Sequence, residues 1–401
     1  MNKPALVSAL IAMWVTSSAY ALEGDTFRPF VSFSRYYDNN LFRQAENEDI
    51  SIDGSLRRGP QTDSYNVLAF GANVDWRIKR QQVLARASKS LVRYSNFNSL
   101  DYDGSDYLAQ WNWQLGNHWN GQVGATRTLS QSSFIDLNII NAVNNQRTID
   151  NAFTTVNWQF HPRWQVGGSL SKVKSGNSDL SQIANTFTEQ AQELNLTWRT
   201  PKGTSIRTQI RIAEADYPNR ELGIVDNSYT QQELNVFSVW PYSGLLQFQG
   251  RLGYQRREHK NLSQRDFSGF TGRYTADYFA TSKTVFSLSL YRELGAVSEI
   301  SSSYRLTTGF SLNASWAITP KLTLRGGLVD GTADFEGDPG FTLFAVPVRQ
   351  DKAQTASINL GYQPLKSTMV SIGLQAGHRE SNYPSNDYEF NTIFANVQVN
   401  F

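Results

Sequence analysis

The chain has 401 residues, no cysteine and a formal net charge of +2. Without cysteine it can form neither a disulfide framework nor a thiolate metal site. The near balance of charge, with no basic cluster, excludes a typical nucleic-acid-binding protein. Aromatic residues make up 13% of the chain and charged residues 18%, a mixture that suits a protein with one thin apolar outer face.

The first residues predict a secretory signal peptide over residues 1–21. An apolar run from Ala5 to Val15 follows Lys3, and small residues lead to an Ala-Tyr-Ala cleavage site that ends at Ala21. The run is too short to span about 30 Å of hydrocarbon, so we expect export rather than anchoring. No later window reaches the roughly 18 consecutive apolar residues of a spanning helix. Residues 22–401 are therefore predicted to form the mature domain.

From Phe27 onward, segments of similar length carry apolar side chains at every second position, and the last of them ends at Phe401. A strand that shows one face to lipid and the other to water must alternate in this way, and a closed barrel satisfies its backbone in a bilayer. The predicted strands are 27–37, 64–78, 83–95, 105–115, 119–130, 149–160, 164–174, 188–199, 204–215, 229–240, 245–256, 267–279, 284–293, 304–317, 322–333, 353–363, 368–379 and 388–401.

Eight short turns alternate with nine longer polar stretches, which gives eighteen strands; sixteen is the alternative count. Proline cannot donate to a strand ladder, and in the predicted mature chain it falls only in connections and at the start of the first segment. Every tryptophan after the leader lies within about six residues of a short turn, as expected of an aromatic girdle at a membrane interface. The sequence predicts an all-β, transmembrane, antiparallel up-and-down β-barrel in a bacterial outer membrane.

The polar side of each strand is expected to face the barrel interior, because an arginine on the lipid face near the midplane costs on the order of 2–4 kcal/mol. The pore-lining candidates are Asp75, Gln110, Asn157, Glu193, Arg207, Gln209, Arg211, Gln247, Gln249, Arg251, Arg273, Asp277 and Arg325. This lining is rich in amides and mixed in charge. It favours a hydroxyl-rich solute such as a saccharide, although any water-filled porin also needs a polar interior.

Three cations toward the long-loop end interrupt apolar stretches: Arg127, Lys172 and Lys174. They are expected either to face lipopolysaccharide phosphates in charge-assisted pairs or to belong to frayed strand ends. Lipopolysaccharide and outer-membrane lipid are therefore expected partners.

Catalytic and metal-binding chemistry has little support. His259 and His378 lie near long loops, but no spacing typical of a nucleophile and its base accompanies them. Acidic runs at 46–53 and 334–338 do not match a calcium-binding loop. We expect no catalytic residue, metal or cofactor, and no enzyme activity.

The opening of the mature chain, Phe30 to Arg43, contains the segment Tyr-Asp-Asn-Asn-Leu-Phe-Arg at 37–43. It resembles the first strand and loop of the EpsL-type, exosortase-associated polysaccharide transporters, which are related to the β-barrel porin type 2 proteins. The resemblance implies a barrel that acts in secretion of an extracellular polysaccharide, with a polysaccharide substrate and periplasmic export components as partners. It implies no catalytic set, and the Asp38-Asn39-Asn40 stretch also fits an Asx-rich turn that ends the strand.

The predicted function is a porin-like outer-membrane channel that takes part in polysaccharide export. The first alternative is a general or sugar-uptake diffusion porin. The second is a surface adhesin or receptor whose long loops bind partners.

Overall fold

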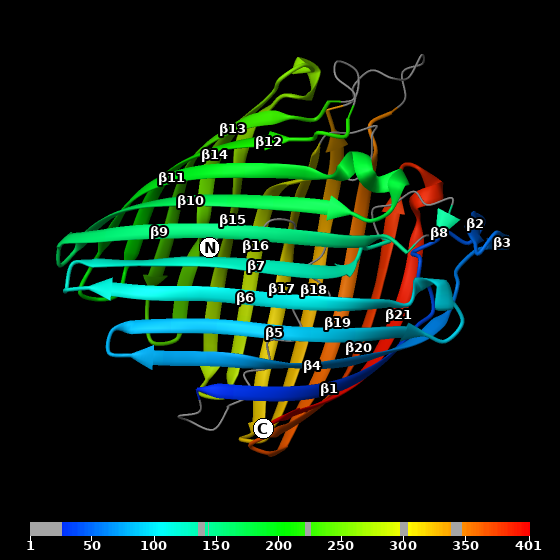
Figure 1. Cartoon of the computed structure of the whole chain (residues 1–401), viewed down its shortest axis with the longest axis horizontal. Helices are drawn as coiled ribbons and strands as arrows, with labels where there is room; N and C mark the ends of the chain where they lie inside the picture. The colour runs from blue at the N-terminus through cyan, green and yellow to red at the C-terminus, as the bar shows by residue number, and fades with distance from the viewer. Residues whose placement is uncertain (1–25, 135–140, 143, 221–225, 297–303, 338–346) are drawn as a thin grey trace.

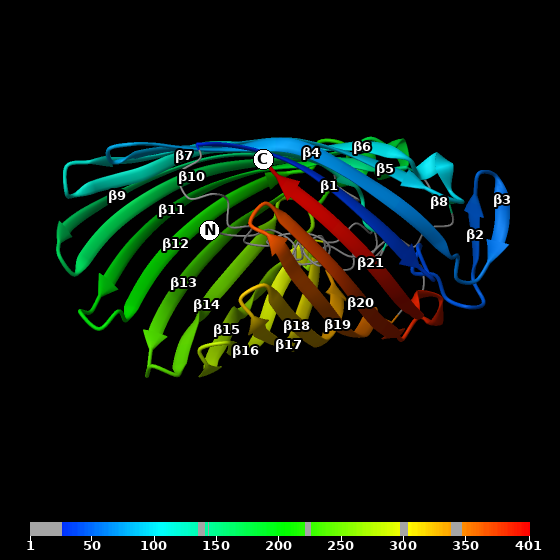
Figure 2. The same cartoon turned by 90° about the horizontal axis from the view of Figure 1, so that it is seen from below.

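The computed structural model describes residues 26–134, 141–142, 144–220, 226–296, 304–337 and 347–401. Eighteen strands form one antiparallel sheet (Figure 1). The sheet closes because the first strand, β1 (Phe27–Asp38), pairs with the last, β21 (Tyr388–Asn400), on one side and with β4 (Asp63–Ile78) on the other. Figure 2 shows β1 and β21 side by side at this closure. None of the described helices is long and apolar enough to cross a membrane.

Each remaining barrel strand pairs with the barrel strands that precede and follow it in the chain. They are β5 (Gln81–Tyr94), β6 (Tyr102–Leu115), β7 (Trp119–Gln131), β9 (Gln146–His161), β10 (Trp164–Asn177), β11 (Phe187–Arg199), β12 (Ser205–Asp216), β13 (Tyr229–Pro241), β14 (Leu246–His259), β15 (Phe267–Thr281), β16 (Thr284–Ala296), β17 (Tyr304–Thr319), β18 (Leu322–Glu336), β19 (Gln350–Leu365) and β20 (Thr368–Ser381). The predicted count of eighteen is confirmed and the alternative of sixteen is wrong. The predicted signal peptide lies outside the described residues and stays a prediction.

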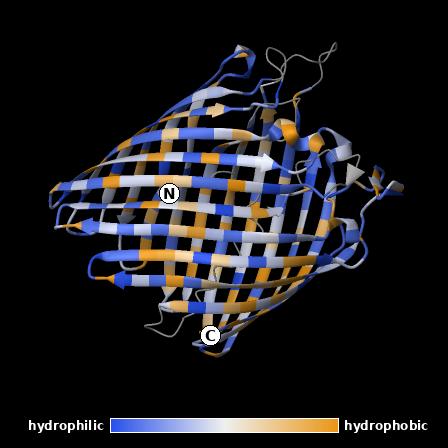
Figure 3. Ribbon diagram, in the orientation of Figure 1, coloured by the Kyte–Doolittle hydropathy of each residue, from blue (hydrophilic) through white to orange (hydrophobic). Residues whose placement is uncertain are grey.

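The two faces of the wall differ as the alternation predicts. On β12, Ile206, Ile210 and Ile212 are 39%, 53% and 48% exposed, while Gln209 between them is buried. Orange and blue residues alternate along the strands in Figure 3. Because apolar side chains of this size are left exposed around the whole wall, their face must meet lipid rather than water. We call this face the outer face and the opposite one the inner face.

Aromatic rings gather at the end of the barrel that carries the short turns. Trp119 of β7 stacks on Trp158 of β9 with ring centroids 5.6 Å apart, and Trp164 lies 6.5 Å from Trp198. Several of these rings are more than 40% exposed, including Trp240 at 48%. An amphipathic indole favours the headgroup level of a bilayer. The ring positions therefore mark the periplasmic edge of the apolar band.

The opposite end contains structure that the sequence did not predict. The first long loop forms two four-residue strands, β2 (Asp49–Ile52) and β3 (Ser55–Arg58), and β2 also pairs with β8 (Asn141–Ala142). Ile50 and Ile52 are fully buried there in an apolar cluster. The other members are Leu41, Phe42, Val92, Tyr94, Phe97, Leu100 and Phe134. The loop at this mouth is thus a packed element rather than a solvated polar stretch.

The segment at 37–43 joins this loop to the barrel closure. The Asp38 carboxylate accepts two hydrogen bonds of 2.8 Å from the Arg43 guanidinium and one from the backbone N–H of Asn40 at 2.9 Å. Thr392 on β21 donates to the same carboxylate at 2.8 Å. The fully buried Asn40 side chain donates to the carbonyl oxygens of Gln44 and Glu389. The segment therefore links the first strand and its loop to the last strand through hydrogen bonds. These contacts go beyond the Asx-rich turn that was predicted for residues 38–40.

Candidate functional site

The inner face carries the polar side chains of every second strand position. On β12 these are Arg207, Gln209 and Arg211, which alternate with the exposed isoleucines. Register pairs keep residues of neighbouring strands on the same face, so Arg211 lies between Glu193 of β11 and Glu233 of β13. The closed sheet brings these groups together inside the barrel. This wall is the candidate site for passage of a polar solute.

Arg211 is the centre of a cluster of charges. Its guanidinium contacts Glu233 at 2.7 Å, Glu189 at 2.5 Å and Glu193 at 3.4 Å, and its side chain is only 11% exposed. Three carboxylates surround one cation, which is therefore fully neutralised. Removing it would leave three like charges in close contact. Arg211 thus holds β11, β12 and β13 together and offers little charge to a passing solute.

Amides extend this cluster along the wall. Gln209 donates to Glu193 at 2.9 Å, and Asn235 donates to Glu233 at 2.9 Å. Arg251 of β14 donates to the Asn235 side-chain oxygen at 3.1 Å and lies 3.8 Å from Glu233. The cluster therefore spans four strands with its donors and acceptors largely matched.

Two further strands repeat the pattern of paired charge. Arg273 of β15 makes two hydrogen bonds of 3.0 Å to Glu293 of β16. Asp277 accepts from Gln249 at 2.8 Å and from the Ser287 hydroxyl at 2.5 Å. The charges on this part of the wall are fixed by neighbours rather than directed at the interior.

Arg207 and Arg325 differ from the other predicted arginines. Arg207 lies over the Phe237 ring, 4.0 Å from its centroid, a cation–π arrangement that leaves the charge in place. Arg325 lies between Ser315 and Asn359 in register. Within the described parts of the chain neither forms an ion pair. Of the five predicted arginines, these two are the ones without an ion pair there, and Glu193 lies close enough to act electrostatically on Arg207.

The wall from β4 to β9 is built mainly from amides. Asp75 is bound by Arg77 at 3.1 Å and by Gln82 at 2.8 Å. Gln110 donates to Asn112 at 2.7 Å, and Asn112 donates to Gln82 at 3.1 Å. Asn157 and Gln247 also lie on the inner face, opposite Asn120 and Asp277 in register. All of the predicted candidates thus lie on the polar side of the sheet; their role in transport stays a prediction.

Several inner-face residues near the long-loop end were not predicted from the sequence. Glu189 and Glu233 complete the Arg211 cluster, and Arg257 lies 3.9 Å from the centroid of the Tyr229 ring while donating to Gln231 at 2.8 Å. The same alternation, continued to the strand ends, would have found them. The contacts among these residues could not be predicted, because alternation gives the face on which a residue lies and not its cross-strand partner.

One loop carboxylate outside the strands is held by several donors. Asp226 is 3% exposed and accepts from the Ser228 backbone N–H at 2.9 Å and from Asn261 at 2.6 Å. Burial acts to raise the pKa of Asp226, but these hydrogen bonds and the charge of Lys260 outweigh it, so the pKa is lowered. The carboxylate is therefore ionised at neutral pH and ties the loop after β12 to the loop after β14.

No group of three or more His, Asp or Glu residues within the described ranges could hold a metal ion. The acidic run at 334–338 is only partly described, because position 338 lies outside the described residues. His259 is buried against Tyr229, with ring centroids 5.8 Å apart, and lies 3.5 Å from Asp266. This packing gives His259 structural contacts with an aromatic ring and a carboxylate.

A known family of β-barrel proteins matches the C-terminal part of the chain. Residues 242–401, less than half of the chain, match the family described as "Putative beta-barrel porin 2". The match does not reach the segment at 37–43, so the resemblance to exopolysaccharide transporters stays a prediction. No curated protein matches the chain.

Solved structures share the fold over nearly the whole length. OpdQ of Pseudomonas aeruginosa is similar with a TM-score of 0.52 and 11% identity, over 94% of this chain and 98% of that one. OpdK of the same organism, solved with vanillate, and a BenF-like porin of Pseudomonas fluorescens Pf-5 each give a TM-score of 0.50 and 12% identity, over 94% of this chain and 99% of theirs. With its lipid-facing outer wall, the chain is a porin-like β-barrel of the bacterial outer membrane.

Proposed function

We propose that this barrel is an outer-membrane channel that passes neutral, hydroxyl-rich solutes, with saccharides as the substrate class. The observation that carries the proposal is the state of charge on the inner face. Arg211 and Arg273 are paired with carboxylates, and the Asp277 carboxylate accepts hydrogen bonds from Gln249 and Ser287. Amide side chains supply most of the remaining polar groups.

Such a wall suits a sugar for a physical reason. Hydroxyl groups need donors and acceptors to replace the water that they lose in a narrow passage. Amides supply both, and a charge that is already paired does not trap the solute. A strongly charged substrate would instead be favoured by a surplus of unpaired charge of one sign. Arg207 and Arg325 form no ion pair within the described residues, but Glu189, Glu193 and Glu233 outnumber Arg211 and Arg251, so neither sign of charge is in clear surplus.

Reconstituted proteoliposomes test this proposal directly. We expect faster swelling in glucose and maltose than in a charged solute of similar size, and a rate that falls smoothly with oligosaccharide length. Planar bilayers should show steady conductance that is reduced by added oligosaccharide. Equal exclusion of all sugars, with free passage of salt, would contradict the proposal.

A second candidate function is export of an extracellular polysaccharide, and the segment at 37–43 favours it through its resemblance to exopolysaccharide transporters. Export and uptake would use the same lining, so the inner face does not distinguish them. Deletion of the gene distinguishes export from uptake. Loss of extracellular polysaccharide with normal growth on sugars supports export. Unchanged polysaccharide with slower growth on a limiting sugar supports uptake.

A further inference from the structure

We infer that the outer face of β9 to β12 binds a phosphorylated, acylated glycolipid of the outer leaflet, of the lipid A class. Two features of the wall meet there. One is a shallow apolar groove on the lipid-facing side, and the other is a pair of lysines, Lys172 and Lys174, directly above it on β10. The inference concerns the lipid-facing wall and is independent of what passes through the interior.

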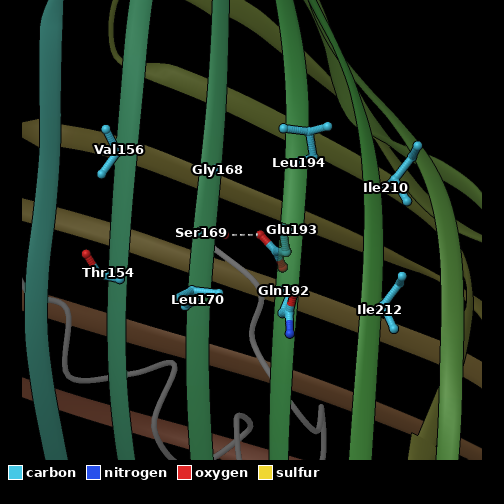
Figure 4. A pocket seen from close by; sticks show the side chains of 10 residues that line it. All are labelled: Thr154, Val156, Gly168, Ser169, Leu170, Gln192, Glu193, Leu194, Ile210 and Ile212. Atoms are coloured by element: carbon cyan, nitrogen blue, oxygen red, sulfur yellow. Dashed lines mark hydrogen bonds between the residues drawn. The ribbon is translucent and has the colours of Figure 1, made fainter.

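The groove exists because Gly168 lacks a side chain. Four apolar side chains line the groove around Gly168 (Figure 4): Leu170, Leu194, Ile210 and Ile212. The hollow has a volume of about 450 Å³. Leu170 and Leu194 are 56% and 60% exposed. An open apolar hollow on a wall that meets lipid offers contact area to an acyl chain without any water to displace.

The upper end of the groove is polar. Thr154 and Gln192 flank Leu170 in register on the two neighbouring strands and line the groove. Two residues further along β10, on the same face, Lys172 lies between Ala152 and Gln190. A hydroxyl and an amide below a cation match the order of groups in an acylated phosphoglycolipid: acyl chain, ester or amide link, then phosphate.

The position of the lysines along the strand agrees with this order. Trp164 marks the periplasmic edge of the apolar band, and Lys172 follows eight residues later on the same face. At about 3.3 Å per residue and a tilt of about 45°, Lys172 lies about 19 Å and Lys174 about 23 Å above that edge. The apolar band is about 25 Å tall, so both ammonium groups reach the level of outer-leaflet phosphates by extending upward.

The surrounding charges leave this pair available. Lys174 lies opposite Asp150 in register, but Asp150 already contacts Arg127 at 3.6 Å. Glu214 lies one strand beyond Gln190, which separates it from Lys172. Both lysines are exposed, and neither forms an ion pair within the described ranges. A phosphate would give them charge-assisted partners.

The test uses the full-length protein in detergent and measures binding of purified bisphosphorylated lipid A by native mass spectrometry. The double variant K172Q/K174Q should weaken binding by at least about tenfold. The control is K89Q, since Lys89 is an exposed cation that pairs with Phe70 and Ser105 in register, away from the groove; it should leave binding within about twofold. Equal binding by the double variant and the wild type would overturn the inference.

Two further measurements separate headgroup from groove. Dephosphorylated lipid A should bind the wild type about as weakly as lipid A binds the double variant; equal affinity for the two lipids would overturn the role of the lysines. G168L fills the groove, and it is expected to fold because a Cβ there would lie 3.6 Å from the nearest atom, the Glu193 carbonyl oxygen. Retained lipid A binding by folded G168L would overturn the role of the groove, and tighter binding of phosphatidylglycerol would overturn the glycolipid assignment.

Discussion

Individual arginines on the inner face have different roles, although the sequence pattern presents them alike. Arg211 is enclosed by three carboxylates, whereas Arg207 lies over an aromatic ring and forms no ion pair within the described residues. A carboxylate cancels the field of a cation at the range of a passing ion, whereas an aromatic face leaves it largely intact. Ion preference should therefore depend on Arg207 and Arg325, and cohesion of the wall on Arg211.

The variants R207Q and R325Q should each reduce the preference for anions over cations, by a factor on the order of two. The physical reason is that each removes a cation that forms no ion pair within the described residues. Reversal potentials across a potassium chloride gradient in planar bilayers provide the measurement. R273Q, at a cation paired with Glu293, serves for comparison. If R207Q and R325Q both keep the wild-type reversal potential, they have no role in selectivity.

R211Q should destabilise the barrel by about 3 kcal/mol, because it leaves Glu189, Glu193 and Glu233 mutually repelling in a partly buried site. Urea unfolding from lipid vesicles, followed by tryptophan fluorescence, measures this change. The double variant R211Q/E233Q removes one of the repelling charges and should recover part of the loss. A loss of stability in R211Q/E233Q equal to the sum of the losses in R211Q and E233Q would show that the two groups do not interact.

At the scale of elements, strands were predictable and loop structure was not. A strand such as β12 carries its own signal, since its side chains must alternate between lipid and a polar interior. The short strands β2 and β3 have four residues each, and β2 is buried in a cluster that includes residues far along the chain, such as Phe97 and Leu100. Similarly, the polar face of β12 was predictable from the sequence. The partners of Arg211 were not, because they depend on the register of β12 with two other strands.

The loop after β1 should exchange its amide hydrogens faster when the Asp38 carboxylate is removed. D38A loses the two bonds to Arg43 and those to Asn40 and Thr392, and we expect destabilisation by about 3 kcal/mol. Hydrogen exchange over residues 39–44, together with thermal unfolding, measures the effect. R43Q added to D38A should cost little more, because both act on the same contact. Unchanged exchange in D38A would show that this contact does not hold the loop.

The loop containing Asp226 should weaken in acid. A lowered pKa in the folded state means that the carboxylate stabilises the loop above its unfolded pKa of about 3.9, and that this contribution is lost as pH falls through the lower folded value. Hydrogen exchange at Asn227 and Ser228 should therefore report constant local stability above about pH 5 and a decline below about pH 4. D226N should remove this dependence; a decline of equal size in the variant would assign it to another group.

At the scale of the whole molecule, the fold depends on the closure between β1 and β21. Backbone hydrogen bonds join Asn39 to Asn391 and Phe401 to Pro29. Hydrogen-bonded and non-hydrogen-bonded pairs alternate along an antiparallel ladder. The pair Ser34 and Asn396 therefore falls at a non-hydrogen-bonded position, where side chains approach most closely, and the Asn396 amide indeed donates to the Ser34 hydroxyl at 2.8 Å.

The absence of cysteine in the native chain makes this closure directly testable. S34C/N396C should form an intrachain disulfide under mild oxidation, because cross-strand Cβ atoms at such a pair lie near the separation that a disulfide requires. Loss of free thiols and faster migration of the unfolded, unreduced chain on a denaturing gel would report it. S34C/Q398C, in which the second residue pairs with Ser32 instead, should cross-link far more slowly. Equal cross-linking of both variants, or of neither, would contradict the register that closes the barrel.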